Sequence, residues 1–382
     1  MPREEGNGEK DNPIKSIAES MNLKEGEEAV RRVLTEVYRR GRVGTKDIAR
    51  AARLPVPVAA AIRREMEKRG LIIRKGGATL SEEGKKLAAS LNLAGGTPQH
   101  AEKDPGNLEH RETLEKLRTL SKLRPPPDTT LDQAFATPET ALKRALYMLE
   151  NGDLAGRDVL FLGDDDFTSV AAALLGVAKS LTVVDIDERV LGAIGEASDG
   201  EGLGVRCVRH DLRDPLPGEH RGRYDVVFTD PSYTVPGLEL FLSRAVGALR
   251  PRKTASVYVA FADKPPLEML EVHRAITGMG LFVRELIPGF NEYEGAEMFG
   301  NVSSMMRLST TEEATPAVTG AFEGAIYTGE LRPTMRVYRC RCGARVNVGV
   351  GRKFTTIEEL KASGCPSCGS RQGFRLLRRK NV

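Results

Sequence analysis

Three consecutive carboxylates, Asp164, Asp165 and Asp166, are the residues of this 382-residue chain whose spacing most clearly suggests chemistry. They follow an apolar strand pattern, Val159 to Leu162, and precede a helical run of small residues. At this first strand-to-helix turn a nucleotide-binding α/β fold usually carries glycines, which let an anionic ligand approach the helix N-terminus. Two like charges roughly 4 Å apart repel by about 4 kcal/mol at an effective dielectric constant near 20. The position therefore predicts a nucleotide, and the charges predict that its reacting end is a cation.

The charges also discriminate between two forms of S-adenosylmethionine. The intact molecule has a carboxylate that ordinarily lies over this turn, whereas the decarboxylated form keeps only a sulfonium and an ammonium group. Three carboxylates attract the second form and repel the first, so we expect Gly163 and Asp164 to contact decarboxylated S-adenosylmethionine as the co-substrate. A plain helix N-terminus is the alternative, because acidic residues there gain about 0.3–1 kcal/mol each. One Asp would satisfy that role, and three need a cationic partner.

Further carboxylates follow the second and third strands of the pattern. Asp185 ends the second strand, about twenty residues after the turn, where an acidic side chain accepts hydrogen bonds from ribose hydroxyls. Asp211 follows the third strand and is expected to hold the adenine amino group. Asp187 is expected to cap the helix that begins at Glu188.

The fourth strand ends in the sequence Phe-Thr-Asp-Pro-Ser-Tyr-Thr, residues 228–234. A protonated amine is not a nucleophile, and the Asp230 carboxylate can accept an N–H bond and orient the lone pair. Tyr233 can form one wall of the amine site through a cation–π contact. We assign catalytic roles to Asp230 and Tyr233 together with Asp165 and Asp166, and Asp166, furthest into the predicted cleft, is the expected base. Asp-Pro is also a common start of a turn, which is the structural alternative.

Asp-Pro-x-Tyr directly after a strand resembles the signature of enzymes that alkylate amines. Together with Gly-Asp-Asp-Asp at 163–166 and Thr-Pro-Glu-Thr at 137–140, it resembles the branched-chain polyamine synthase family over residues 25–310. The resemblance implies two aminopropyl transfers to the internal nitrogen, N4, of spermidine, with release of methylthioadenosine. It also implies that the acidic turn and the Asp-Pro loop flank the reacting nitrogen. The sulfonium is already a good leaving group, so no catalytic metal is expected. The family usually has a second Pro where this chain has Ser232.

The segment from Asn291 to Phe299 contains three carboxylates and two aromatic residues. This composition suits a lid over a polyamine chain, and a plain surface loop is an equal alternative. We expect Glu292 and Glu294 to bind the substrate, together with Thr234 of the Asp-Pro loop.

Charge is distributed unevenly along the chain. Residues 153–300 hold 24 Asp and Glu against 15 Lys and Arg, a net charge of −9, so the remaining residues carry +13 and the whole chain +4. An acidic middle favours a cationic substrate, whereas basic flanks either contact nucleic acid or are solvated surface, the interpretation we favour. Neither a membrane-spanning run nor a signal peptide is evident, so we expect a cytoplasmic protein without membrane contact. Abundant charge and the absence of Trp are compatible with a thermophile.

Strand and helix patterns alternate through the middle of the chain. Strands are expected at 157–162, 181–185, 204–208, 224–229, 254–260 and 280–286, and helices at 167–178, 188–198, 237–248 and 265–278. A preceding helix starts near Thr137, with Pro138 in its first turn. The alternation predicts a mostly parallel sheet, and hence a doubly wound, methyltransferase-like (Rossmann-type) α/β core over residues 131–310.

The flanks predict smaller units. Residues 1–24 are polar and expected to be disordered, whereas residues 25–92 show three helices, two short strands and a last helix, an order that resembles a winged helix-turn-helix. We favour a packing or dimerisation role for this unit over DNA contact, although its third helix offers Arg63, Arg64, Lys68 and Arg69. Linkers are expected at 93–130, with one charged helix inside, and at 311–335. We also expect a homodimer.

Four of the five cysteines lie in the last 47 residues, 336–382, as two close pairs. The pattern predicts a tetrahedral structural Zn²⁺ held by the thiolates of Cys340, Cys342, Cys365 and Cys368. A bound iron or no metal at all are the alternatives. Cys207 stands alone in a strand pattern and is expected to be a small buried residue. The chain ends in a basic tail that includes Arg371, Arg375, Arg378, Arg379 and Lys380.

Two other functions stay open at this point. An S-adenosylmethionine-dependent N-methyltransferase acting on nucleic acid or protein would explain Asp-Pro-x-Tyr and the basic flanks, and the acidic turn argues against it. A DNA-binding regulator that senses adenosyl ligands would explain the N-terminal unit, and the intact run 230–234 argues against it.

Overall fold

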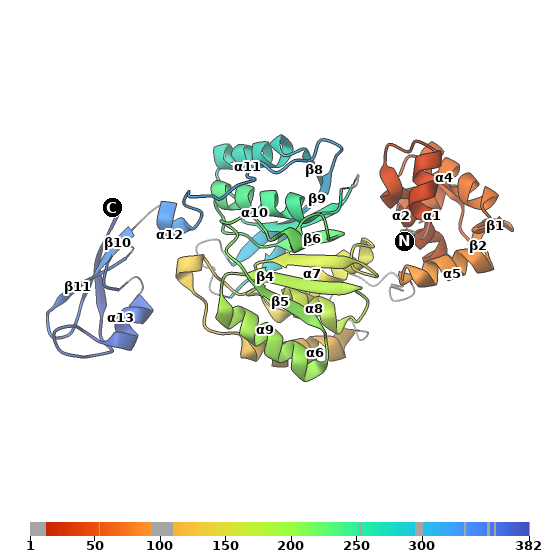
Figure 1. Cartoon of the computed structure of the whole chain (residues 1–382). Helices are drawn as coiled ribbons and strands as arrows, with labels where there is room; N and C mark the ends of the chain where they lie inside the picture. Colours follow the sequence, from red (N-terminus) through yellow and green to blue (C-terminus); the bar gives the residue numbers. More distant parts are fainter. Residues whose placement is uncertain are drawn as a thin grey trace, which may run out of the picture.

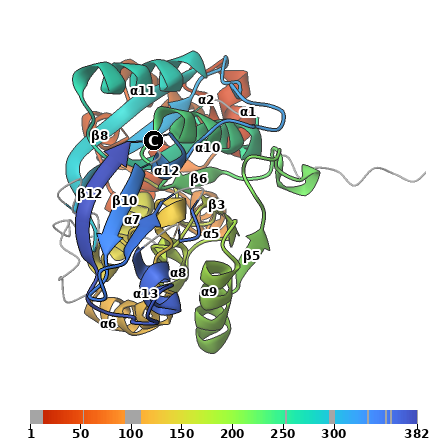
Figure 2. The same cartoon turned by 90° about the vertical axis from the view of Figure 1, so that its left-hand side faces the viewer.

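The computed structural model describes residues 13–52, 54–93, 110–251, 254–294, 301–331, 334–349, 352–354 and 357–381. A central α/β core carries an N-terminal helical unit on one side and a small C-terminal sheet on the other (Figure 1). Figure 2, turned by 90°, has the C-terminal sheet in front of the core. Within the described part of the chain, every helix is too short or too polar to cross a lipid bilayer.

The core is built on a seven-stranded sheet in the order β5-β4-β3-β6-β7-β9-β8. Five strands run parallel: β3 (Asp158–Leu162), β4 (Ser180–Asp185), β5 (Val205–Arg209), β6 (Val226–Thr229) and β7 (Ser256–Phe261). The hairpin of β8 (Leu281–Glu292) and β9 (Val302–Thr310) adds two strands at one edge, with β9 antiparallel to both of its neighbours. The prediction of a mostly parallel, doubly wound core is confirmed.

Helices cover both faces of this sheet, as the parallel strands require, because their side chains are apolar on both sides. One face is covered by α6 (Arg111–Leu120), α7 (Pro138–Glu150), α8 (Thr168–Leu174) and α9 (Glu188–Glu201), which share one hydrophobic cluster. The opposite face is covered by α10 (Val235–Ala248) and α11 (Pro266–Gly278) around a second cluster. The turn between β3 and α8 therefore lies between two packed layers.

The helix predicted inside the linker 93–130 is α6, and it packs on the core rather than crossing a free linker. It buries Leu114 and Leu117, and residues 94–109 lie outside the described part. Short 3-10 turns follow at η3 (Ser121–Leu123) and η4 (Thr129–Leu131). In the second predicted linker, 311–335, α12 (Thr328–Leu331) follows the buried side chains of Ile326 and Tyr327.

The N-terminal unit contains four helices, a two-stranded hairpin and a fifth helix. These elements are α1 (Pro13–Ser20), α2 (Gly26–Arg40), α3 (Thr45–Ala51), α4 (Val56–Lys68), β1 (Ile72–Arg74), β2 (Ala78–Leu80) and α5 (Glu82–Ser90). The prediction of disorder over residues 1–24 is wrong for α1, and residues 1–12 lie outside the described part. Ile14, Ile17 and Ala18 recur at helical spacing and are buried among the helices of this unit, which stabilises a segment that is otherwise polar.

The basic side chains of α4 are largely compensated by neighbouring carboxylates. Arg63 pairs with Glu67 at 2.7 Å, and both Lys68 and Arg69 approach Glu65. Arg69 also bonds Ser16 of α1. Of the four basic residues named for this helix, Arg64 alone is exposed with no ion pair to a described residue, so the helix presents one uncompensated positive charge.

The C-terminal unit is a three-stranded antiparallel sheet in the order β11-β10-β12. Its strands are β10 (Thr334–Arg339), β11 (Arg345–Val348) and β12 (Arg375–Asn381), and α13 (Ile357–Ser363) lies in the connection between the last two. A small apolar cluster that includes Val346, Val348 and Leu360 joins the sheet to α13. The four clustered cysteines lie in the loops of this unit.

Candidate active site

The predicted site residues gather where the strand order reverses, between β3 and β6. In open α/β sheets this is where ligands bind, outside the carboxyl ends of the strands. An open hollow lies here, lined by Gly163, Asp165, Asp185, Asp211 and Asp230 among others. Five of the residues predicted from sequence therefore line one hollow.

Asp164, the first carboxylate of the turn, faces the helix rather than the hollow. Its two oxygens accept bonds from the backbone N–H groups of Thr168 and Ser169, at 2.9 and 3.0 Å. Burial raises the pKa of Asp164 to about 8. The turn that brings Asp164 back to the start of α8 has left-handed backbone at Gly163 (φ 73°) and Phe167 (φ 62°). Asp164 is thus the cap of α8, the role considered as the alternative for one Asp of the three.

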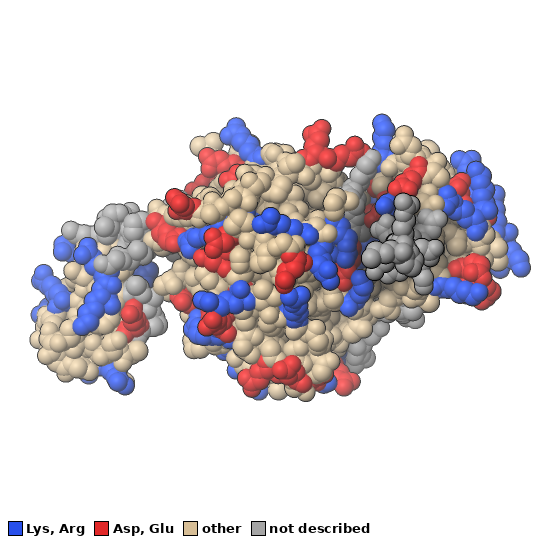
Figure 3. Space-filling view, in the orientation of Figure 1, with Lys and Arg blue, Asp and Glu red and all other residues tan. Residues whose placement is uncertain are grey.

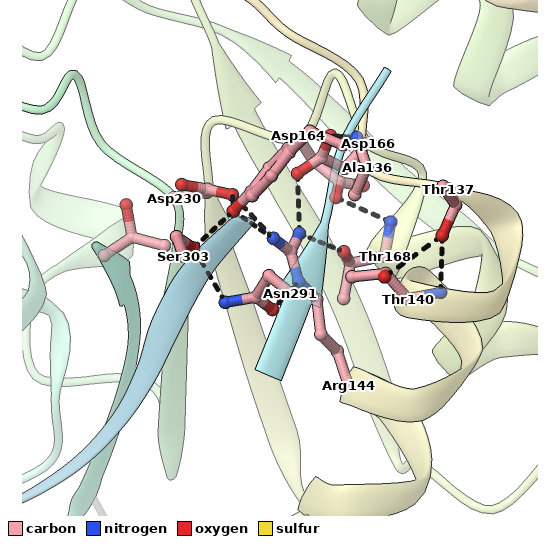
Figure 4. Close-up of polar contacts among 12 residues, drawn as sticks. Ala136, Thr137, Thr140, Arg144, Asp164, Asp166, Thr168, Asp230, Asn291 and Ser303 are labelled. Atoms are coloured by element: carbon pink, nitrogen blue, oxygen red, sulfur yellow. Dashed lines mark hydrogen bonds and ion pairs between the residues drawn. The ribbon is translucent and has the colours of Figure 1, made fainter. Parts of the chain in front are cut away.

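Asp166 and Asp230 are joined by Arg144, a fully buried residue of α7 (Figure 4). The two guanidinium Nη atoms donate to Oδ2 of Asp166 and Oδ2 of Asp230, each at 2.6 Å. Its Nε donates to Oδ1 of Asn291 at 2.9 Å. The other oxygen of Asp166 accepts the backbone N–H of Ala136. Asp166, the predicted base, therefore has both oxygens occupied by donors.

Two tyrosines extend this network from Asp230. The Tyr293 hydroxyl donates to Oδ2 of Asp230 at 2.7 Å, and the Tyr233 hydroxyl donates to Tyr293 at 2.8 Å. Burial raises the pKa of Asp230 to about 7, although Arg144 acts in the opposite direction. Ser303 of β9 lies 2.9 Å from the Tyr293 hydroxyl.

Asp165 differs from its neighbours because its carboxylate has an unoccupied oxygen. Within the described residues, Oδ2 of Asp165 is buried and has no hydrogen-bond partner. Burial, and then the neighbouring carboxylates Asp166 and Asp185, raise the pKa of Asp165 well above its ordinary value. A buried, unpartnered carboxylate oxygen at the edge of a hollow is suited to accept a proton from an incoming ligand.

The residues predicted to hold the nucleoside lie along the same hollow. Asp185 accepts the backbone N–H groups of Asp164 and Asp187, at 3.1 and 2.8 Å, which fix its carboxylate at the end of β4. Burial raises the pKa of Asp185. Asp211 accepts the N–H of Arg213 at 2.9 Å. The prediction that Asp187 caps the next helix is confirmed by its bond to the N–H of Arg189 at 3.0 Å.

The three predicted substrate residues do not lie together. Thr234 caps α10 by accepting the N–H of Gly237 at 3.0 Å, whereas Glu292 and Glu294 are exposed. Because side chains alternate along a strand, the inward positions next to them belong to Asn291 and Tyr293. Residues 295–300 of the predicted lid lie outside the described part.

Ser232, which stands where the family usually has Pro, has a definite contact. Its hydroxyl and that of Thr234 both donate to the carbonyl of Ile326, at 2.8 and 2.6 Å. The bonds hold the segment that leads to α12 against the Asp-Pro loop, and the next residue, Tyr327, lines the hollow. The substitution thus gives this segment a second tether to the site.

Sequence reasoning missed the polar residues that connect the predicted carboxylates: Arg144, Asn291, Tyr293 and Ser303. Arg144 lies four residues after the Thr-Pro-Glu-Thr motif. Because it is far from the carboxylates in sequence, its pairing with them was not predicted. Tyr293 is an aromatic residue within the predicted lid, and the alternation along β8 was the only available sign that it points inward.

The four thiols of the C-terminal unit form a separate cluster. The sulfur atoms of Cys340, Cys342, Cys365 and Cys368 all lie within 4.8 Å of one another. Two of the separations are 3.7 and 3.9 Å. A tetrahedron with Zn–S bonds of about 2.3 Å has edges of about 3.8 Å, so the donor set fits zinc in both type and size.

The fold and this site together define a nucleoside-binding α/β protein of the Rossmann type, with an acidic site at the switch point. A model of the branched-chain polyamine synthase A C-terminal domain matches residues 112–331. The chain therefore belongs to the branched-chain polyamine synthase family. An uncharacterized protein of Methanocaldococcus jannaschii is 39% identical over 97% of this chain and 93% of its own length.

Named relatives match a large part of the chain. The N(4)-bis(aminopropyl)spermidine synthase of M. jannaschii is 31% identical over 63% of this chain and 70% of that protein. The Thermus thermophilus branched-chain polyamine synthase, solved in complex with N4-aminopropylspermidine and 5'-methylthioadenosine, is 27% identical. The match covers 83% of this chain and 97% of that structure, with a TM-score of 0.53.

Proposed function

We propose that this protein transfers aminopropyl groups from decarboxylated S-adenosylmethionine to the internal, N4, amine of spermidine, forming branched polyamines and methylthioadenosine. The observation that carries the proposal is the acidic cluster at the switch point, where Asp165, Asp166 and Asp230 outnumber the cation Arg144. An excess of buried carboxylate attracts a substrate with several positive charges. The names of the relatives and the ligands of the Thermus structure support the same chemistry.

In this proposal the co-substrate lies along the hollow with its nucleoside toward β4. Asp185 accepts the ribose hydroxyls and Asp211 the adenine amino group, and Gly163 leaves room for the sugar. The sulfonium and ammonium groups then face Asp165 and Asp230. An intact amino acid tail would bring its carboxylate against these side chains and would be repelled.

The transfer then needs one proton acceptor and one aligned nucleophile. In the first cycle Asp165 takes one of the two protons of the N4 ammonium of spermidine, and Asp230 accepts the single N–H bond that remains. In the second cycle Asp165 takes the only proton of the tertiary N4 ammonium, and the product is a quaternary ammonium whose charge faces Asp230. The N4 lone pair attacks the carbon next to sulfur, the C–S bond breaks, and sulfur keeps the electron pair as methylthioadenosine. Tyr233 and Tyr293 line the amine side and exclude water. Asp166 holds Arg144 in place, so we assign the base to Asp165 rather than to Asp166.

Mass spectrometry of the products tests the proposal. Spermidine with decarboxylated S-adenosylmethionine should yield products heavier by one and then two aminopropyl groups, together with methylthioadenosine. Comparable methyl transfer from intact S-adenosylmethionine to spermidine, nucleic acid or protein would instead support the N-methyltransferase alternative. Binding of both adenosyl compounds without turnover would support the regulator.

Identifying the preferred acceptor amine requires parallel assays of several polyamines. M. jannaschii has both a named synthase and the uncharacterized relative that matches nearly the whole of this chain. Linear polyamines of different length, assayed beside spermidine, would identify the preferred acceptor. If the protein aminopropylates another polyamine and leaves spermidine unchanged, aminopropyl transfer would stand as the reaction and spermidine would be wrong as the acceptor.

We further propose a structural Zn²⁺ at the four clustered cysteines, a winged-helix arrangement of the N-terminal unit and a homodimer. Metal analysis of the parent protein and of Cys365→Ser tests the zinc site, with one Zn²⁺ per chain expected in the parent and loss in the variant. Equal metal content, or none in either protein, would contradict it.

A further inference from the structure

The C-terminal sheet has a charge that the proposed chemistry does not use. Residues 334–382 contain 12 Lys and Arg and two acidic residues, Glu358 and Glu359. Figure 3 shows Lys and Arg side chains spread over the C-terminal unit, apart from the mixed charges of the core. The family model ends at residue 331, before β10 begins, so this sheet lies outside the matched domain.

The strand register concentrates the charge on one face. Arg339 of the central strand lies directly opposite Arg345 of β11 and directly opposite Arg375 of β12. Directly paired residues on neighbouring strands project to the same side with their Cβ atoms about 5 Å apart, so the three arginine side chains start from one row across the sheet. All three side chains are exposed. Arg378 of β12 pairs with Val337, two residues before Arg339 on the central strand, and so adds a further positive charge to the same face.

The opposite face of the sheet is occupied by its own core. Tyr338, Val346 and Val348 project to that side and pack with Leu360 of α13. The arginine row therefore lies on the other, open face, where the central Val337 is buried and the three arginines are exposed. No carboxylate of the described residues pairs with any of the three guanidinium groups. Like charges directly opposite one another destabilise a sheet. Such a row is stabilised by an external partner with closely spaced negative charges.

We propose that this open face binds the phosphate backbone of duplex DNA without reading its sequence. A DNA duplex carries a negative charge for roughly every 1.7 Å of its axis, which is dense enough to pair with a row of arginines on neighbouring strands. Arginine is the side chain best suited to phosphate, because its planar group donates two parallel hydrogen bonds.

The residue types in this unit argue against a single-stranded partner. Single strands are held by stacking of bases on exposed aromatic rings, whereas Tyr338 and Phe354 are buried and Phe374 packs against the same apolar cluster. The open face offers guanidinium donors and a single side-chain amide, Asn347, and these groups suit phosphate oxygens. Guanidinium groups also donate to the 2′-hydroxyl of RNA, so duplex RNA is the competing partner that the experiment must exclude.

Binding of a short fluorescent DNA duplex to the full-length protein, measured by anisotropy over a range of salt concentrations, tests this proposal. The double variant R339Q/R375Q should bind more weakly, and its slope of log Kobs against log salt should be shallower by about 0.9 for each phosphate that the variant no longer neutralises. R339K/R375K keeps the charge and should retain most of the affinity, which separates the role of the positive charge from any effect on folding. Circular dichroism and aminopropyl transfer should be unchanged in all variants.

The matched control is R206Q/R209Q, which removes two exposed arginines from β5, the edge strand of the large sheet. Their side chains are 58% and 66% exposed, and the net charge changes by the same amount. The control should bind DNA as the parent does. Equal weakening in both double variants would mean that only total charge matters and would overturn the proposal. Absence of binding by the parent, or tighter binding of single-stranded DNA or duplex RNA, would also overturn it. These outcomes are independent of the proposed catalytic function.

Discussion

Arg144 determines which carboxylates of the site are available for proton transfer. It pairs with one oxygen each of Asp166 and Asp230 and leaves Asp165 without a cation. Removing two charges from water is costly, and a buried pair is retained only where good geometry and further hydrogen bonds offset that cost. Here those bonds come from Asn291 and Tyr293. The site therefore separates two carboxylates that position groups from one that accepts a proton.

Asp165→Asn should lower kcat by about 10²-fold or more, the usual range for acid–base groups, with a much smaller change in KM for the co-substrate. The parent's kcat should fall as the pH drops through the raised pKa of Asp165, because only the ionised carboxylate can accept the proton. Steady-state kinetics over a pH series would test both. Asp166→Asn, measured in parallel, should lower kcat through disturbance of Arg144 and leave the acid limb of the profile where it is. If Asp166→Asn removed that limb, the roles of the two carboxylates would have to be exchanged.

Arg144→Lys tests the positioning role. Lysine keeps the charge but cannot bond Asp166, Asp230 and Asn291 at once. We expect a folded protein whose kcat is reduced by about tenfold or more and whose kcat–pH profile shifts, because the pKa of Asp230 rises further from its value of about 7 when its partner is weaker. An unchanged profile with reduced thermal stability would mean that Arg144 serves only the fold.

At the scale of elements, the β3–α8 turn combines two functions in adjacent residues. Asp164 satisfies the first N–H groups of α8, while Asp165 faces the hollow, because left-handed backbone at Gly163 and Phe167 turns successive side chains to different sides. The cap orients the helix, and the helix end fixes where Asp165 lies. A three-residue acidic run thus contributes to both folding and chemistry.

Asp164→Ala should reduce stability by about 0.5–2 kcal/mol, the usual cost of losing a helix cap, and Asp164→Asn by less, because its one carbonyl oxygen can still accept one of the two N–H groups. In the folded chain the pKa of Asp164 is raised from 3.8 to about 8, so protonation stabilises the fold. This contribution declines as the pH rises from about 4 to about 8. Thermal unfolding of the parent and the Asn variant across that range would reveal it as a pH-dependent difference. An increased KM for the co-substrate with unchanged stability would instead show that Asp164 binds the co-substrate.

Patterns within single elements were enough to predict much of this fold. The parallel strands were found from their apolar runs, and the carboxylates at their ends were expected to meet because such ends share one edge of a sheet. Strand β9 was missed, since all but its first residue are buried and its serines and methionines show no alternation. Arg144 and Tyr293 were missed because their roles depend on which helix and hairpin pack beside β3 and β6. That information lies in tertiary contacts rather than in local periodicity.

At the scale of the whole molecule, the N-terminal unit is docked to the core through buried polar contacts. Nη2 of Arg157 donates to both carboxylate oxygens of Glu28 at 2.6 and 2.7 Å, and Arg31 donates to the carbonyl of Ala155 at 2.8 Å. Asn92 bonds the carbonyl of Val177. These contacts hold α2 and the end of the unit against the opposite ends of the strands from the active site.

Glu28→Ala should therefore loosen the N-terminal unit without touching the reacting groups. Removing Glu28 leaves the buried Arg157 without its directly bonded carboxylate, and only the more distant Asp153 and Asp225 then act on its charge. Breaking a buried pair in this way typically costs up to about 3–5 kcal/mol, of the order of half the stability of an ordinary domain. Hydrogen exchange should show faster opening of α2, and kcat should change little at temperatures where the core stays folded. Glu83→Ala, which removes an exposed pair with Lys86, is the matched control and should have no measurable effect. A loss of kcat in Glu28→Ala with normal exchange protection would instead couple the N-terminal unit to the reaction, which would contradict a role confined to packing.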